Sequence, residues 1–519
     1  MFSGSSMPRP THSAEVIVVG AGSAGAAAAR RLFDKGATVL LLEAGGPADN
    51  PAIDDVGRAH ELWHAPEDWA FFTAPQQHAE RRSLHWPRGR VVGGSSCLNA
   101  AIYVRGAAAD FDHWAYLGCA GWRWEDVRPV YERMEDPGPL SVLTDYELAP
   151  LHRSIIEAAA DAGIPFNENY NGGELDGVSQ MHLTIKDGRR QSTGVAYLEP
   201  IAGLEGFTLV TSAHVRRLIL ENGRCRGVEW HSAGELCRAE AEVEVIVAAG
   251  TIQSPQVLML SGIGPADHLR EVGVEPLVDL RGVGLNLHDH LLSPVIFGAE
   301  RPIGPPSPGA TPAQTHLWWR SRPGLPGPDM QPIHFAFPMY EEWMSGPENG
   351  FTFQAGMIRP QSRGSIRLSG PTLADPLVID PRILSAEADL RTLTAAVELS
   401  REIGRQPALR EEWRTTERYP GPEMRSQDEL RDYVRRTAIT YHHQVGTCKM
   451  GTDEQAVVDE RLRVYGVDGL RVGDASIMPA VTSGNTNAPS IMIGERVADF
   501  VSEDSLRAAD GGLRTLHAR

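Results

Sequence analysis

Three glycines and one glutamate near the start of the chain have the types and spacing that a dinucleotide site needs. Gly20, Gly22 and Gly25 form the pattern GxGxxG, and Glu43 follows them. The first glycine of such a pattern permits a tight turn, the second lets the backbone approach a pyrophosphate, and the third allows close helix–strand packing. The carboxylate of Glu43 can accept hydrogen bonds from an adenosine ribose and would repel the 2′-phosphate of NADP. The pattern alone does not separate FAD from NAD.

The segments around these residues predict the elements that hold them. Residues 15–19 form an apolar run typical of a buried strand, and the small residues after Gly25 favour a helix that ends at Gly36. Residues 38–42 form a second apolar run that ends at Glu43. This order predicts a βαβ unit, whose helix directs its N-terminal amides at a bound anion.

The rest of the chain alternates between nucleotide-fold and β-rich patterns. Residues 292–343 are rich in proline and aromatic residues, 351–359 and 364–368 alternate as antiparallel strands do, and 387–403 form an amphipathic helix. Further strands are expected at 207–210, 218–220, 226–230, 243–248 and 470–472, and further helices at 254–260 and 489–501.

Composition narrows the class of protein. A chain of 519 residues is long enough for two domains, or for one domain with large insertions. The formal charge of −18 without a basic run argues against a nucleic-acid partner. Met1–Ser13 lacks the apolar core of a signal peptide, and no apolar run is long enough to span a membrane. The five cysteines have no metal-ligand spacing, so we expect reduced thiols, a cytoplasmic protein and no metal site.

Four segments in order resemble signatures of the glucose–methanol–choline (GMC) oxidoreductase family. They are 89–99 (GRVVGGSSCLN), 250–264 (GTIQSP…SGIG), 282–290 (GVGLNLHDH) and 443–451 (HQVGTCKMG). Gly473-Asp474 resembles the second flavin contact of large FAD enzymes. Within the family, the chain is similar to the bacterial branch that includes choline dehydrogenase, pyridoxine 4-oxidase and 5-hydroxymethylfurfural oxidase.

The resemblance implies an α/β fold, α+β overall, with a Rossmann-type FAD-binding domain and a β-rich substrate-binding domain formed by insertions. We expect the FAD-binding domain to comprise residues 14–150, 190–295 and 435–519, the last with the active site. Residues 151–189 and 296–434 then form the substrate-binding domain.

The resemblance also implies that the cofactor is FAD and names its contacts. Some relatives attach the flavin to a histidine just before the asparagine of the first signature; here Leu98 holds that position, so noncovalent FAD is expected. The cofactor contacts implied are Gly20, Gly22, Ser23, Ala24, Gly25, Glu43, Ala44, Arg88, Val92, Gly93, Ser95, Ser96, Asn99, Val215, Asp474, Ala475 and Thr486.

Two residues are expected to act on the substrate. Hydride removal from an alcohol requires that the hydroxyl proton also leave, and a neutral histidine suits that task. The family register implies His443 as the base, with His442 as the alternative. The same register implies Asn485 as the donor to the substrate oxygen. Asn487 competes for that role, but we expect it to cap a helix starting near Pro489.

The expected reaction is oxidation of a primary alcohol to an aldehyde, with oxygen or another acceptor taking the electrons. An aryl, furan or pyridine carbinol is the expected substrate. A choline-type dehydrogenase, an FAD-containing hydroxynitrile lyase and a catalytically silent FAD protein are the alternatives. The sequence leaves oxidase against dehydrogenase and the oligomeric state open. Candidate substrate-wall residues are Trp318, Trp319, His334, Phe335 and Phe337.

Overall fold

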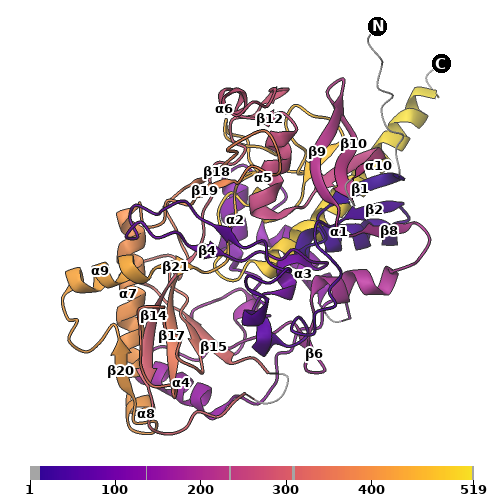
Figure 1. Ribbon diagram of the computed structural model, residues 1–519. Helices are drawn as coiled ribbons and strands as arrows, with labels where there is room; N and C mark the ends of the chain where they lie inside the picture. Colours follow the sequence, from indigo (N-terminus) through magenta and orange to yellow (C-terminus); the bar gives the residue numbers. More distant parts are fainter. Residues whose placement is uncertain (1–11, 136, 233–234, 307–309, 517–519) are drawn as a thin grey trace.

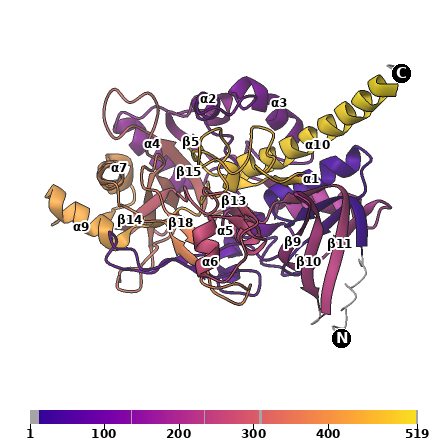
Figure 2. The same ribbon diagram turned by 90° about the horizontal axis from the view of Figure 1, so that it is seen from above.

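The computed structural model describes residues 12–135, 137–232, 235–306 and 310–516. Most of the segment Met1–Ser13, where no signal peptide is expected, lies outside these residues. Two large sheets lie at opposite ends of the molecule, and both views separate them (Figures 1 and 2). None of the helices in the described part of the chain has the length and apolar character needed to cross a membrane.

The first sheet is assembled from strands far apart in the sequence. Its order is β8-β2-β1-β11-β10-β9, with β22 beside β11. The parallel strands are β8 (Phe207–Val210), β2 (Val39–Leu42), β1 (His12–Val19), β11 (Glu235–Val247) and β22 (Leu470–Val472); β10 (Arg224–Ser232) and β9 (His214–Glu221) are antiparallel. All of β2 is buried, as expected for parallel strands covered on both faces.

Two helices from opposite ends of the chain pack together beside this sheet. Helix α1 (Ser23–Asp34) lies against α10 (Asn487–Leu516), and a Cβ at Gly494 would stand 2.1 Å from the carbonyl oxygen of Ala24. Glu495 of α10 is fully buried. Its carboxylate binds Arg31 at 2.6 Å and Arg133 at 2.9 Å. It also accepts the hydroxyl of Tyr197 at 3.1 Å, so one side chain joins four segments.

The second sheet is antiparallel. Its order is β20-β14-β17-β16-β15-β5, with β21 beside β14. The strands are β20 (Thr416–Tyr419), β14 (Leu291–Gly298), β17 (Gly350–Met357), β16 (Ile333–Phe335), β15 (Ala313–Trp318), β5 (Gly177–Gln180) and β21 (Ile439–Thr440). Residues 351–357 do not alternate in burial, because α7 (Glu387–Gly404) packs on one face of β17 and Gln354 faces a cavity on the other.

Other elements of the described residues are seven α-helices and four two-stranded sheets. The helices are α2 (Ala108–Tyr116), α3 (Trp124–Met134), α4 (Pro150–Asp161), α5 (Gly250–Leu260), α6 (Ala266–Glu271), α8 (Pro407–Arg410) and α9 (Gln427–Thr437). The two-stranded pairs are β3 (Phe71–Phe72) with β4 (His85–Trp86), β6 (Ile185–Lys186) with β7 (Arg189–Arg190), β12 (Ile263–Gly264) with β13 (Val278–Asp279), and β18 (Ser365–Arg367) with β19 (Val378–Asp380).

Two predicted helix starts are wrong by a few residues. Helix α5 begins at Gly250 instead of 254, because Asp474 accepts the amide of Gly250 at 2.8 Å. Helix α10 begins at Asn487 instead of Pro489, and the amide of Ser490 donates to the carbonyl of Thr486 at 3.0 Å. Asn487 is therefore inside the helix and does not cap it; its side-chain oxygen accepts the hydroxyl of Ser23 at 2.6 Å.

Candidate active site

A cavity of about 1100 Å³ connects the βαβ unit with the second sheet. Its walls include the turn after β1, the end of β2 and the first turns of α5 and α10 on one side. Strands β16, β17 and β21 supply the other side. This volume exceeds the roughly 300–1,000 Å³ of pockets for one small molecule, so the cavity has room for a large cofactor and a small substrate.

Most of the predicted cofactor residues meet at this cavity. Those that line it are Gly20, Gly22, Ser23, Ala24, Glu43, Ala44, Arg88, Ser95, Asn99, Val215, Asp474, Ala475 and Thr486. The predicted residues that do not line it are Gly25, Val92, Gly93 and Ser96. The segments of the chain that carry the wall residues are therefore brought together from both ends of the sequence.

In the glycine turn, a Cβ atom would meet the protein itself at Gly25 and the cavity at Gly22. A Cβ at Gly25 would lie 1.8 Å from the carbonyl oxygen of Gly20, so this glycine is required by the protein itself. A Cβ at Gly22 would meet only the Cα of Gly94, at an ordinary 3.8 Å, and would otherwise enter the cavity. Gly22 thus leaves space that only a ligand would fill, which fits a pyrophosphate approaching the start of α1.

Glu43 has a structural role in addition to its predicted one. Its carboxylate accepts the amide of Ala21 at 2.9 Å and that of Gly45 at 2.8 Å, which ties the end of β2 to the glycine turn. Burial raises the pKa of this carboxyl to about 7, and the two amide bonds oppose that rise. Glu43 also lines the cavity, and each carboxylate oxygen can accept a further hydrogen bond, as from a ribose hydroxyl.

Asp474 joins the first turn of α5 to the loop after β22 at the cavity wall. One carboxylate oxygen accepts the amide of Gly250 at 2.8 Å and the hydroxyl of Ser254, and the other accepts the amide of Ser476 at 2.8 Å. Burial raises its pKa above the ordinary value. Asp474 therefore holds the N-terminus of α5 against the loop after β22, and it lines the cavity as well.

Some residues of the 88–99 loop line the cavity, and others support the loop from behind. Ser95 lines the cavity and accepts the amide of Gly89 at 3.0 Å. Behind the wall, the amide of Gly93 donates to the carbonyl of Ala21 at 2.8 Å, and the hydroxyl of Ser96 donates to the carbonyl of Gly93 at 2.6 Å. These hydrogen bonds hold the loop against the glycine turn. Leu98 lines the cavity at the place where an attaching histidine would stand.

The two predicted catalytic side chains are in contact. The amide nitrogen Nδ2 of Asn485 lies 3.2 Å from Nε2 of His443, and both residues line the cavity. On its other side, Nδ1 of His443 lies 3.0 Å from Nδ1 of His290. The ring of Tyr441 stacks on that of His443, with centroids 4.5 Å apart. His443 is thus held on three sides, with Nε2 toward Asn485.

The surroundings keep His443 neutral and assign its tautomer. Burial lowers its pKa well below 6.5, and His290, His442 and Arg88 lower it further. Burial lowers the pKa of His290 to about 3, so both rings are neutral at pH 7. Because the NH₂ group of Asn485 can only donate, Nε2 of His443 carries a lone pair. Its proton is then on Nδ1 and is donated to His290.

Asp289 was not among the expected site residues, yet it positions this histidine. Its carboxylate accepts the amide of His443 at 2.8 Å, the side chain of Gln444 at 3.1 Å and the hydroxyl of Thr440. Burial raises its pKa to about 7. The only signal in the sequence is its place in the 282–290 segment, which indicates no role by itself.

The residues that line the cavity differ from the set expected for the substrate wall. Of the aromatic candidates, Phe335 and Phe337 line the cavity, whereas Trp318, Trp319 and His334 do not. Trp318 is buried and donates to the carbonyl of Ser483 at 3.1 Å, a core contact. Additional lining residues that the sequence did not reveal are Ile333, Met339, Tyr340, Glu341, Glu342, Gln354, Ile439 and Tyr441.

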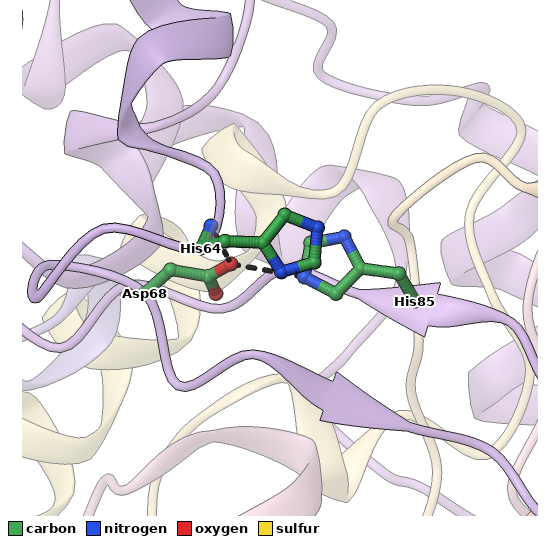
Figure 3. A group of neighbouring side chains, drawn as sticks. All are labelled: His64, Asp68 and His85. Atoms are coloured by element: carbon green, nitrogen blue, oxygen red, sulfur yellow. Dashed lines mark hydrogen bonds and ion pairs between the residues drawn. The ribbon is translucent and has the colours of Figure 1, made fainter.

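His64, Asp68 and His85 form a group whose possible ligand atoms lie within 4.8 Å of one another (Figure 3). The Asp68 carboxylate already accepts Nε2 of His85 and the amides of His64, Ala70 and Arg88, each at 2.9–3.0 Å. These contacts make it an anchor for the loop that carries Arg88. Arg88 in turn donates to the carbonyl of His442 at 2.9 Å.

Comparisons with known proteins give matches over most of the chain. Residues 14–292 match the N-terminal part and residues 360–494 the C-terminal part of the GMC oxidoreductase family. The chain is 37% identical to an oxygen-dependent choline dehydrogenase of Brucella suis biovar 1 (strain 1330), over 94% of this chain and 95% of that protein. It is 38% identical to one of Rhizobium etli, with the same coverage.

Solved structures show the same fold. Pyridoxine 4-oxidase from Mesorbium loti matches with a TM-score of 0.89 and 36% identity, over 93% of this chain and 98% of that chain. A formate oxidase of Aspergillus oryzae RIB40, studied for FAD modification, matches with a TM-score of 0.88 and 25% identity, over 96% and 99% of the two chains.

Proposed function

Because the chain belongs to the GMC oxidoreductase family, we propose that it oxidises a primary alcohol to an aldehyde with noncovalently held FAD. The observation that carries the proposal is the pairing of Nε2 of His443 with Nδ2 of Asn485 on the cavity wall, 3.2 Å apart. A neutral base and a hydrogen-bond donor side by side are what an alcohol needs in order to lose its hydroxyl proton.

The residues present fit FAD. The space beyond Gly22, the N-terminus of α1 and the carboxylate of Glu43 would hold the adenosine and pyrophosphate, and the N-terminus of α10 would face the flavin ring. Leu98 offers no nitrogen for covalent attachment. Acid precipitation of the purified protein should therefore leave the yellow colour in the supernatant; colour in the pellet would overturn this part of the proposal.

When bound, FAD accepts the hydride that leaves the carbinol carbon. The protein supplies the rest. His443 takes the hydroxyl proton at Nε2, and the charge that results is shared through the Nδ1 contact with His290. Asn485 donates from Nδ2 to the substrate oxygen as alkoxide character develops. The buried walls exclude water, which strengthens both interactions.

For the substrate we propose a small neutral carbinol with an aromatic ring. Phe335, Phe337 and Tyr441 offer aromatic surface, and the buried amide of Gln354 can hold one polar substituent. A second candidate is a cationic alcohol such as the choline of the named relatives, because Glu341 places a carboxylate on the same wall. The oxygen dependence of those relatives makes oxygen the first acceptor to test.

The decisive experiment is anaerobic reduction of the bound flavin by one good alcohol, followed by stopped flow. Loss of a general base typically slows the step by about 10²- to 10⁴-fold, so His443→Ala should fall in that range and still bind FAD. His442→Ala is the matched control, since His442 also lines the cavity, whereas the hydrogen bond from Nδ2 of Asn485 in the described part of the chain goes to His443. Near-native reduction in His443→Ala with a large loss in His442→Ala would reverse the assignment. No reduction of the wild type by any alcohol would favour the lyase alternative.

A further inference from the structure

A buried glutamine stands behind the catalytic asparagine. Nε2 of Gln331 lies 3.3 Å from Oδ1 of Asn485, on the side away from His443. Gln331 is 0% exposed and does not line the cavity. Gln331 lies two residues before strand β16 of the second sheet, whereas Asn485 lies two residues before α10. The contact therefore links the two halves of the molecule at the reacting centre.

The contact decides which end of the Asn485 amide faces the substrate. An asparagine side chain has one accepting and one donating end, and the two have nearly the same shape. With Gln331 donating to Oδ1, the NH₂ group faces His443 and the substrate oxygen. In the flipped orientation, Oδ1 would face the lone pair on Nε2 of His443. That repulsion is relieved only if Nε2 holds a proton, and a protonated Nε2 cannot act as the base.

The protein holds the backbone of Gln331 in place independently of Asn485. The backbone amide of Gln331 donates to the carbonyl of Gly356 at 2.9 Å, and its carbonyl accepts the hydroxyl of Tyr441 at 3.2 Å. The side-chain oxygen Oε1 is buried and has no hydrogen-bond partner among the described residues. A buried amide that leaves its acceptor unpaired costs free energy, so its single contact to Asn485 calls for an explanation.

We propose that Gln331 is a positioning residue that locks the Asn485 amide in its donating orientation and thereby keeps Nε2 of His443 unprotonated, so that this nitrogen can take the substrate proton. This inference rests on the proposed function, since it assigns Gln331 a part in that same reaction. It requires no contact between Gln331 and the substrate or the cofactor.

The first test is a double-mutant cycle on the holoenzyme. Gln331→Met keeps the shape and removes the donor, and we expect anaerobic flavin reduction to slow by about tenfold, the value of one hydrogen bond. Asn485→Ala should slow it by a similar or larger factor. Because Gln331 acts through Asn485, the double variant should be no slower than Asn485→Ala alone. Multiplying effects would overturn the proposal, as would native-speed reduction in Gln331→Met.

A matched control separates positioning from folding. Gln76 is equally buried, but its side chain bonds only Ala74, Asp380 and Ile383, away from the cavity. Gln76→Met should lower the thermal midpoint at least as much as Gln331→Met and leave the reduction rate unchanged. If the two variants lose rate in proportion to their loss of stability, Gln331 has only a structural role.

The second test uses Gln331→Glu and the pH dependence of reduction. A protonated carboxyl can donate to Oδ1 of Asn485, whereas a carboxylate can only accept. We therefore expect a near-native rate at low pH and a fall as the introduced group ionises, a limb that Gln331→Met lacks. The other titratable groups around His443 are His290, His442, Arg88, Asp289 and Tyr441, and all five remain in every variant, so only the introduced carboxyl distinguishes the two profiles. A profile identical to that of Gln331→Met would refute the proposal. Wild-type flavin that no alcohol reduces would instead refute the proposed function.

Discussion

The two glycines Gly22 and Gly25 belong to one motif, yet the structure predicts opposite consequences for replacing them by alanine. In the absence of a clash, Gly→Ala in or beside a helix stabilises by up to about 1 kcal/mol. At Gly25 the new Cβ would stand 1.8 Å from the carbonyl oxygen of Gly20 and 3.2 Å from Cβ of Ala248. Neither neighbour can retreat, because Gly20 itself packs against the carbonyl of Ala248.

We therefore expect Gly25→Ala to destabilise the protein by at least about 3 kcal/mol, the upper end for overpacking, with or without FAD. At Gly22 the nearest protein atom to the new Cβ is 3.8 Å away and the backbone φ of −77° suits alanine. Gly22→Ala should leave the stability of the FAD-free protein within about 0.5 kcal/mol of wild type. It should weaken FAD binding by about 10- to 100-fold, because the methyl group enters the space for the cofactor.

The assay compares thermal unfolding of FAD-stripped and reconstituted protein, together with a fluorescence titration of FAD. Wild-type FAD affinity in Gly22→Ala would show that the cofactor does not approach this glycine. A lowered midpoint for the stripped Gly22→Ala protein, or a native midpoint for Gly25→Ala, would show that the steric reasoning is wrong.

Two further predictions concern the substrate end of the cavity. Because burial lowers the pKa of His443 below 6.5 and only the neutral ring accepts a proton, the anaerobic reduction rate should be constant above about pH 6.5 and decline only in more acidic buffers; stopped flow across pH 5–9 checks this, and a rate still rising above pH 7 would contradict it. Glu341→Gln should raise KM for a cationic alcohol by about fivefold, corresponding to roughly 1 kcal/mol for a partly exposed charge, and leave KM for benzyl alcohol unchanged; steady-state kinetics with both substrates decide it, and equal shifts would remove the carboxylate from substrate recognition.

The features of the fold that could be predicted are those that depend on residues close together in the sequence. The turn of Gly20, the helix that follows it and the strand ending at Glu43 depend on residues close in sequence, and the family register extends that knowledge to His443. The start of α10 was misplaced, because proline was expected at the first helical position and stands at the third. A motif also does not show which of its residues face a cavity, as the buried supporting contacts of Gly93 illustrate.

The contacts around His443 and Asn485 could not be predicted in the same way. His443 meets Asn485 across 42 residues, and Gln331 meets Asn485 across 154. No periodicity or spacing connects such positions, since their distance is set by how two sheets and their loops pack. The sequence therefore indicates which residues can do the chemistry, and the tertiary structure determines which atoms they present to each other.

The contacts of Glu495 with Arg31, Arg133 and Tyr197 have a consequence for the order in which the folded chain can assemble. During synthesis Arg31, Arg133 and Tyr197 emerge before their partner Glu495, which follows them by 464, 362 and 298 residues. Strand β22 and the N-terminus of α10, which complete the sheet and the cavity, arrive equally late. A nascent chain therefore cannot close its nucleotide site before α10 has been translated. A chain truncated before α10 would leave Arg31, Arg133 and Tyr197 without this partner and the cavity without one of its walls.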